Sequence, residues 1–110
     1  MSDPISNLPW SEQFRIVAKQ WVELDEAASL LEETKSAVLS QRMNALGDVP
    51  VSHAERAVKA SVEWRDFVEK MVRARTAANL KKVQMEFLRM KFNEWNSDNA
   101  NRRAEMRLTA

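Results

Sequence analysis

The chain has 110 residues, with 17 Lys and Arg against 16 Asp and Glu, a single Gly, three Pro and no Cys. This length suits one domain, and the scarcity of Gly and Pro beside abundant Ala, Glu, Leu and Lys favours long helices over sheet. The absence of Cys excludes disulfides, thiolate metal sites and a cysteine nucleophile. No apolar run is long enough to span a membrane, and no basic-then-apolar leader begins the chain. We therefore expect a soluble cytoplasmic protein without a membrane partner.

The two halves of the chain carry opposite charge. Residues 1–69 hold seven Lys and Arg against twelve Asp and Glu, whereas residues 70–110 hold ten against four. The net charges of the two segments are thus −5 and +6. Either the two halves attract each other across an antiparallel helix pair, or the basic half binds an acidic partner such as nucleic acid.

The first helix is predicted over residues 11–46, after an irregular arm at 1–10 that holds two of the three prolines. Ser11 is the expected N-cap. Apolar positions then recur at alternating spacings of three and four, which is the heptad pattern of a packed helix. The seam consists of Phe14, Val17, Trp21, Leu24, Ala28, Leu31, Lys35, Val38, Arg42 and Ala45.

A turn is predicted at 47–51, followed by a second helix over 52–96. Gly47, with Pro50 shortly after it, is a strong helix stop. Ser52 and Glu55 have the spacing of a capping box that begins the second helix. Because the connection is short, the two helices should form an antiparallel hairpin.

The second helix carries two apolar stripes rather than one. One stripe should pack on the first helix, with Ile5, Leu8 and Trp10 folding over its far end. The other, which begins at Leu80, has no partner within the chain, and a monomer rarely leaves such a surface in water. The sequence therefore predicts a homo-oligomer, most simply a dimer that forms a helical bundle. The predicted interface residues are Leu80, Val83, Phe87, Met90 and Trp95.

After "NSDNAN", which looks like a break, a short C-terminal helix is predicted over residues 98–108 with Asp98 as its cap. The predicted fold is thus all-α: one domain over 1–110, built as a long, coiled-coil-like antiparallel hairpin with a short last helix.

No catalytic or metal-binding pattern is present in the sequence. The single histidine, His53, has no Glu at the spacing of a metal motif, and one glycine cannot build a phosphate-binding loop. The acidic pairs Asp25/Glu26 and Glu32/Glu33 read better as solvated helix faces than as metal ligands. We expect a protein that is not an enzyme and that needs no cofactor or metal.

Basic residues instead form a pattern on the second helix and beyond it. Arg75, Lys82 and Arg89 follow one another at intervals of seven, so they form one line along a helix. Such a line could neutralise DNA phosphates; alternatively it is a solvated face that pairs with acidic residues of the first helix. The candidate nucleic-acid-binding residues are Arg73, Arg75, Lys81, Lys82, Arg89, Lys91, Arg102, Arg103 and Arg107.

The C-terminal half resembles small helical proteins encoded by bacteriophages and prophages beside homologous-recombination genes. The segments that carry this resemblance are "AERAVKAS", "RARTAANLKKV" and "FNEWNSDNANRRAEM". The resemblance implies a role in phage DNA metabolism in the cytoplasm of a bacterial host, and it implies no residue-by-residue activity.

Three functions remain open at this point. The first is an oligomeric DNA-binding or recombination accessory factor. The second is an adaptor or inhibitor that binds a host or phage protein through the second apolar stripe. The third is a scaffold whose only partner is itself.

Overall fold

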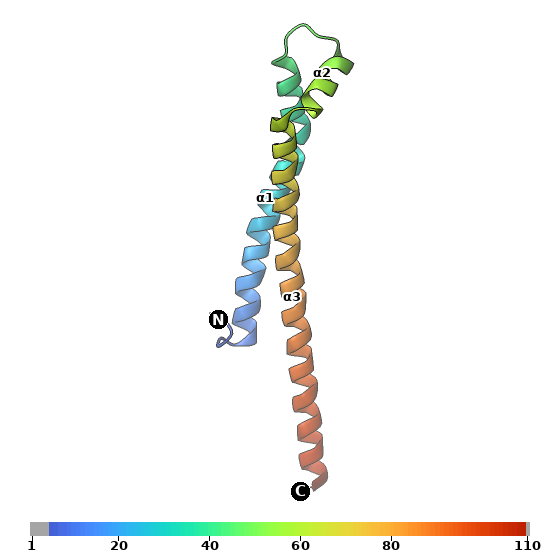
Figure 1. Cartoon of the computed structure of the whole chain (residues 1–110). Coiled ribbons are helices and arrows are strands. Elements are labelled where there is room, and N and C mark those ends of the chain that lie inside the picture. The colour runs from blue at the N-terminus through green and yellow to red at the C-terminus, as the bar shows by residue number, and fades with distance from the viewer. Residues whose placement is uncertain (1–4, 110) are drawn as a thin grey trace. The chain divides into compact units, whose positions relative to one another are not determined.

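A computed structural model describes residues 5–109, and this part of the chain is all-α (Figure 1). Its helices are α1 (Trp10–Asn44), α2 (Val51–Lys59) and α3 (Val62–Thr109). The long helices α1 and α3 pack antiparallel, and the short α2 lies between them in the chain, so the predicted helical hairpin is confirmed at this level.

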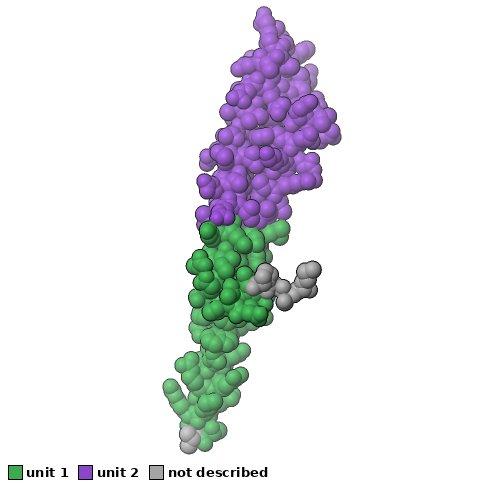
Figure 2. All heavy atoms as spheres, turned by 90° about the vertical axis from the view of Figure 1, so that its left-hand side faces the viewer, with its two compact units in different colours: residues 1–21, 80–110 green, residues 22–79 purple. Residues whose placement is uncertain are grey.

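The chain divides into two compact units, which are coloured separately in Figure 2. Unit 1 joins residues 1–21 to 80–110, of which 5–21 and 80–109 are described. Unit 2 comprises residues 22–79. Each unit has its own packed interior.

The interior of unit 1 is an apolar cluster of Val17 from α1 with Met85 and Leu88 from α3. Val17 is fully buried, and Leu88 is 8% exposed. Ile5 and Trp10 pack against the cluster, as do Phe14, Ala18 and Trp21. The N-terminal arm therefore does fold over this end of α3, as expected for Ile5 and Trp10, whereas Leu8 stays 38% exposed.

The N-terminus of α1 is held by the backbone and not by the predicted Ser11 cap. The carbonyl of Pro9 accepts hydrogen bonds from the amides of Glu12 and Gln13, both at 3.0 Å. The buried Gln13 side chain donates from Nε2 to the carbonyl of Leu8 at 2.7 Å. Because these bonds already satisfy the first turn, α1 begins at Trp10 and the prediction of Ser11 as N-cap is wrong.

Unit 2 packs small residues between its helices. Ala28 of α1 and Ala78 of α3 are fully buried, which is consistent with a close approach of helix backbones. Trp64 is 6% exposed and stacks on Phe67 with ring centroids 5.6 Å apart. Ala54 and Val58 bury the inner face of α2.

The predicted seam of the first helix is buried or half-buried from Phe14 to Leu31. Farther along α1, the seam residue Val38 is half-buried, whereas Lys35 and Arg42 are exposed and Thr34, Leu39 and Met43 are half-buried. The charged side chains thus stay in water, and apolar or hydroxyl neighbours next to them in the sequence are half-buried in their place.

Gly47 ends the first helical segment as predicted. It has a φ of +84°, a left-handed conformation that glycine adopts without steric cost. The amide of Gly47 donates to the carbonyl of Asn44 at 3.1 Å, which closes the last turn after α1.

The predicted second helix is in fact two helices, and the predicted capping box is wrong. Helix α2 begins at Val51 behind Pro50, without a side-chain cap hydrogen bond. The helical path then breaks at Ala60–Ser61. The Ser61 hydroxyl accepts the Trp64 amide at 3.2 Å and donates to the Val58 carbonyl at 2.5 Å. Ser61 therefore caps α3 because its side chain competes with helical backbone bonds at this point.

The prediction of a break at residues 97–98 and of a separate helix over 98–108 is also wrong. Helix α3 continues without interruption to Thr109. The segment "NSDNAN" contains no Pro or Gly, and Asn, Ser and Asp each cost a helix interior only a few tenths of a kcal/mol.

Replacing Leu88 with Ala should lower the free energy of unfolding by about 2–5 kcal/mol, because the change opens a cavity beside Val17. Urea denaturation followed by circular dichroism at one fixed protein concentration measures this loss. The matched control is Leu30→Ala on the 62% exposed site of α1, which should change stability by less than about 1 kcal/mol. Equal effects of the two substitutions would contradict the assigned core.

Candidate functional site

The most prominent surface feature of unit 1 is a row of exposed apolar side chains on α3. Leu80, Val83, Phe87 and Met90 are 66%, 65%, 55% and 61% exposed. We call these residues the apolar strip. Their spacings of three, four and three place them on one helix face. No segment among residues 5–109 buries this row, in agreement with the prediction that it has no partner within the chain.

The apolar strip lies on the side of α3 that faces away from the core. At 100° per residue, its centre is roughly 150° around the helix from the buried pair Met85 and Leu88. Helix α3 therefore has two apolar faces in unit 1. One is covered by α1 and the N-terminal arm, and the other is exposed to solvent.

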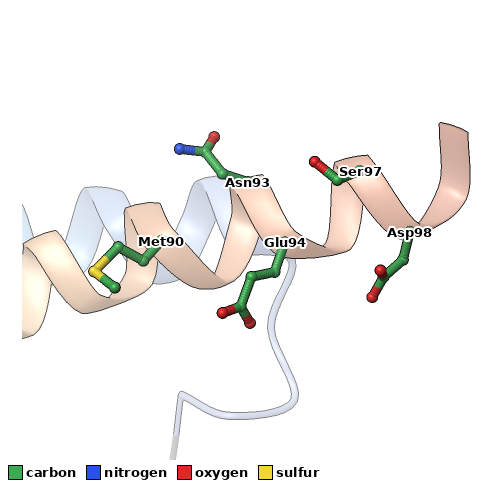
Figure 3. A pocket seen from close by; sticks show the side chains of 5 residues that line it. All are labelled: Met90, Asn93, Glu94, Ser97 and Asp98. Carbon is green, nitrogen blue, oxygen red and sulfur yellow. The ribbon is translucent and has the colours of Figure 1, made fainter. Parts of the chain in front are cut away.

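A shallow hollow continues the same face of α3 beyond Met90 (Figure 3). It is lined by Met90, Asn93, Glu94, Ser97 and Asp98, all from successive turns of α3. In Figure 3, Asn93 and Ser97 point to one side of the helix, whereas Met90, Glu94 and Asp98 point to the other. Residues so arranged form the kind of hole that accepts a side chain from a neighbouring helix. The hollow has acidic walls, since Glu94 and Asp98 contribute carboxylates.

The last part of α3 has little protein around it. From Lys91 to Thr109 every residue is exposed except Asn99, which is half-buried. In unit 1 this red end of α3 extends past the start of α1 (Figure 1). This segment continues without a break from the packed part of α3, so it needs no separate helix nucleation, but few tertiary contacts stabilise it.

Trp95, also predicted as an interface residue, lies in this exposed segment and not on the apolar strip. It is 49% exposed and stacks on Phe92 with a centroid distance of 6.2 Å. The structure thus separates Trp95 from the other four predicted interface residues.

Arg75, the first residue of the predicted basic line, is engaged within unit 2. Its guanidinium binds Glu32 through both carboxylate oxygens, with Nε–Oε2 at 3.0 Å and Nη2–Oε1 at 2.7 Å. Nη1 donates to Asp25 at 2.6 Å, and Nη2 also donates to the Ser29 hydroxyl at 3.2 Å. Arg75 therefore follows the alternative reading, in which a cation of α3 pairs with acidic residues of α1.

The bond from Arg75 lowers the pKa of Glu32 from its ordinary value of 4.5. Hydrogen bonding to the carboxylate is the largest cause, because it favours the ionised form. The pKa of Arg75 is raised by the same bond to Glu32 and by its bond to Asp25. The two helices are thus joined here by a network with two acidic residues and one cation.

Other predicted cations make weaker local contacts. Arg73 pairs with Glu69 at 2.7 Å, four residues away on the same helix. Arg89 lies 3.6 Å from Glu86 and over the ring of Phe14 at 5.7 Å. Three more cations contact neutral groups: Lys81 the Gln84 side chain, Lys91 the Phe87 ring, and Arg103 the Asn99 carbonyl.

Lys82, Arg102 and Arg107 form no ion pair within the described residues. By helical geometry, Lys82, Arg89, Arg103 and Arg107 lie within roughly 60° of one another around α3. All four belong to unit 1. Arg75 is therefore not part of this surface. The remaining cations of the predicted line and of the C-terminal segment form a basic face on the C-terminal part of α3.

A grouping of side chains that could hold a metal ion is not found in the part of the chain that is described. No cluster of three or more His, Asp or Glu side chains converges there. Across residues 5–109, no helix combines the length and apolar character that a bilayer crossing requires.

The chain matches no family model, and comparisons with curated proteins and with solved structures find no match either. The interpretation of its function therefore depends on the surfaces described above.

Replacing Arg75 with Met should lower the midpoint of thermal unfolding near pH 7, because it removes the bonds to Glu32 and Asp25. The folded pKa of Glu32 lies below its ordinary value. Its stabilising contribution is therefore present above about pH 4.5 and lost as the pH falls through the lowered folded value. The difference between wild type and variant should shrink over that acidic range.

The control for this experiment is Lys59→Met, which breaks only an exposed pair with Glu55 within one helix turn of α2. It should change the midpoint little at any pH. Thermal unfolding followed by circular dichroism from pH 7 to pH 3 measures both variants. If the unfolding midpoint of Arg75→Met stays below that of wild type by a constant amount down to pH 3, the Glu32 network does not account for the difference.

Proposed function

We propose that the protein is a non-enzymatic accessory factor that works by binding other macromolecules along α3. The observation that carries this proposal is the apolar strip, which is more than half exposed at each residue and lies opposite the core face. Covering such a row with an amphipathic helix is a common mode of polypeptide recognition.

The free energy of burying apolar surface favours coverage of the apolar strip by a partner. Complete burial of a large apolar side chain contributes about 1.5–3 kcal/mol. The four residues are 55–66% exposed, so covering them contributes the corresponding part of that free energy against the entropic cost of association. The partner is a helix of another polypeptide, either a copy of this chain or a host or phage protein. Homo-oligomerisation is the simplest form of this function, as the sequence predicts.

Phe87→Asp should abolish complexes that depend on the apolar strip. Placing a carboxylate in an apolar contact removes roughly 3 kcal/mol or more of binding free energy, which is at least about a hundredfold in Kd. Size-exclusion chromatography of the purified chain, and capture of partners from a bacterial lysate, measure self-association and foreign partners respectively.

The control is Leu30→Asp, since Leu30 is comparably exposed but lies on α1 in unit 2. It should leave both measurements unchanged. If Phe87→Asp and wild type elute alike and capture the same proteins, the apolar strip is not a binding surface.

DNA binding is the second candidate function, and a separate observation supports it. The C-terminal part of α3 carries several cations without acidic partners among the described residues, including Lys82, Arg102, Arg103 and Arg107. Cations along one helix face neutralise phosphates and release counterions. The resemblance of the C-terminal half to phage proteins found beside recombination genes also favours DNA as the acidic partner.

Changing Lys82, Arg103 and Arg107 to Ala together should weaken DNA binding about tenfold or more at low salt. The slope of log K against log salt should fall by roughly 2–3, because three phosphate contacts are lost. Fluorescence anisotropy with single- and double-stranded DNA at several salt concentrations measures both quantities.

The matched control changes Lys19, Arg42 and Arg65 to Ala, which alters the net charge equally at exposed sites away from this face. It should reduce the salt slope much less. Loss of affinity to the same degree in both triple variants would indicate a non-specific charge effect, and no salt-sensitive binding by wild type at micromolar concentration would remove the DNA hypothesis.

A further inference from the structure

We infer that the occupant of the apolar strip is the apolar strip of a second copy of this chain, with the two α3 helices running in opposite directions. This inference rests on the proposed function and names the partner. It follows from the order of apolar and charged residues along one face of α3. When two copies of this face run in opposite directions, apolar residues meet apolar residues and acidic residues meet basic ones.

The apolar strip matches its own reversed copy. Its spacings of three, four and three read the same in both directions. In an antiparallel pair centred on this row, Leu80 lies opposite Met90 of the second copy, and Val83 lies opposite its Phe87. The smallest residue of the row thus meets the largest, as close packing of facing helices requires.

Charges on either side of the strip also match in this direction. Continuing the same heptad count along α3, Arg73 precedes Leu80 by seven residues, and Glu94 follows Met90 by four. In the antiparallel register, Glu94 of one copy lies opposite Thr76 of the other, three residues (about 4.5 Å along the helix) from Arg73, with which it can pair. Asp98 lies opposite Val72, two residues from Lys70, and can pair with that lysine. Each pair occurs twice in a symmetric dimer. In a parallel dimer, Arg73 would instead face Arg73 and Glu94 would face Glu94 within the seam.

The surface hollows of α3 fit the same register. The acidic hollow of unit 1 is lined by Glu94 and Asp98 among others. A second hollow, in unit 2, is lined by Asp66, Glu69, Lys70 and Arg73. In the antiparallel dimer, the acidic hollow of one copy lies against the second hollow of the other copy. The contact is at the end of that second hollow that holds Lys70 and Arg73.

One charged residue opposes this arrangement. Glu86 flanks the apolar strip and would approach its own copy in the antiparallel dimer, whereas a parallel dimer would place it near Lys91 of the partner. Glu86 lies at the exposed edge, where like-charge repulsion is weakened by solvent, and Arg89 is 3.6 Å from it. Glu94 and Arg73 lie in the seam itself, where like charges cost more. The seam charges therefore decide the direction in favour of antiparallel.

The antiparallel dimer also accounts for the exposed end of α3. Past Met90, this helix is exposed at every position but Asn99. In the inferred register its turns run beside the first turns of α3 in the second copy. A helical segment with few tertiary contacts thereby gains a neighbour along its length.

Cysteine cross-linking tests the direction cleanly because the natural chain contains no Cys. Two single variants, Leu80→Cys and Met90→Cys, are oxidised separately and as a mixture. The antiparallel register brings Leu80 of one copy opposite Met90 of the other, within the Cα separation that a disulfide spans. We expect a disulfide-linked dimer from the mixture and little from either variant alone. A linked dimer from each variant alone would establish the parallel direction and overturn the inference.

A charge exchange tests the register and the identity of the partner. Glu94→Lys should raise the Kd of the dimer about tenfold, because it places two cations together at two sites. Adding Arg73→Glu in the same chain should restore the Kd to within about threefold of wild type. Failure of this second substitution to restore the dimer would contradict the Arg73–Glu94 pairing.

The outcomes separate this inference from the proposed function. A chain that is monomeric at all concentrations, but that captures a foreign protein through Phe87, overturns the second copy as occupant and leaves the binding function standing. A dimer with the wrong cross-links overturns only the antiparallel register. A monomer that captures nothing through Phe87 overturns both.

Discussion

The constraint on which the rest of the structure depends is that α3 has two apolar faces in unit 1 and that the described chain covers only one. Met85 and Leu88 pack on Val17 of α1, with the N-terminal arm folded over them. The apolar strip on the other face remains more than half exposed at every residue. Since water disfavours such a continuous apolar row, the account of function begins with what covers it.

The cations of α3 have two different roles, which depend on whether acidic residues of α1 pair with them. Arg75 is held by Asp25 and Glu32 and joins α1 to α3 within unit 2. The cations nearer the C-terminus lie in unit 1, where Lys82, Arg102 and Arg107 have no carboxylate partner among the described residues. In unit 2, the attraction between the acidic first half and the basic second half of the chain therefore stabilises the fold. In unit 1, the cations of the second half form a basic surface. The sequence alone allowed both roles and did not assign them.

The parts of the fold that depend on local patterns could be predicted from the sequence. The heptad seam of α1 and the glycine stop at Gly47 each follow from spacing or from one residue's conformational freedom. The break at Ser61 could not be separated from an ordinary serine within a helix, because a serine side chain either faces solvent or caps, and tertiary packing decides between them. The signal at Ser52 looked stronger, yet Pro50 begins α2 without it. Continuous helix through "NSDNAN" was also missed, since weak helix formers lower helicity without ending a helix.

The candidate site shows the same division. The sequence spacing identifies the apolar strip, because a helix in a two-helix hairpin needs only one apolar stripe to pack on its neighbour. Trp95 follows Phe92 by three residues and belongs by spacing to the stripe of Met85, Leu88 and Phe92. Its ring contact with Phe92 depends on side-chain packing that periodicity does not contain. The partners of Arg75 were named only as a set of acidic residues, because the choice among them depends on the axial register of α1 against α3.

The central claim is that a second polypeptide covers the apolar strip, and in its simplest form this polypeptide is the chain itself. Sedimentation equilibrium of the unmodified protein over a wide concentration range tests this claim most directly. The account predicts a mass that rises from the 12.7 kDa of one chain to twice that value. A mass of 12.7 kDa at every concentration, with no bound partner, would contradict it.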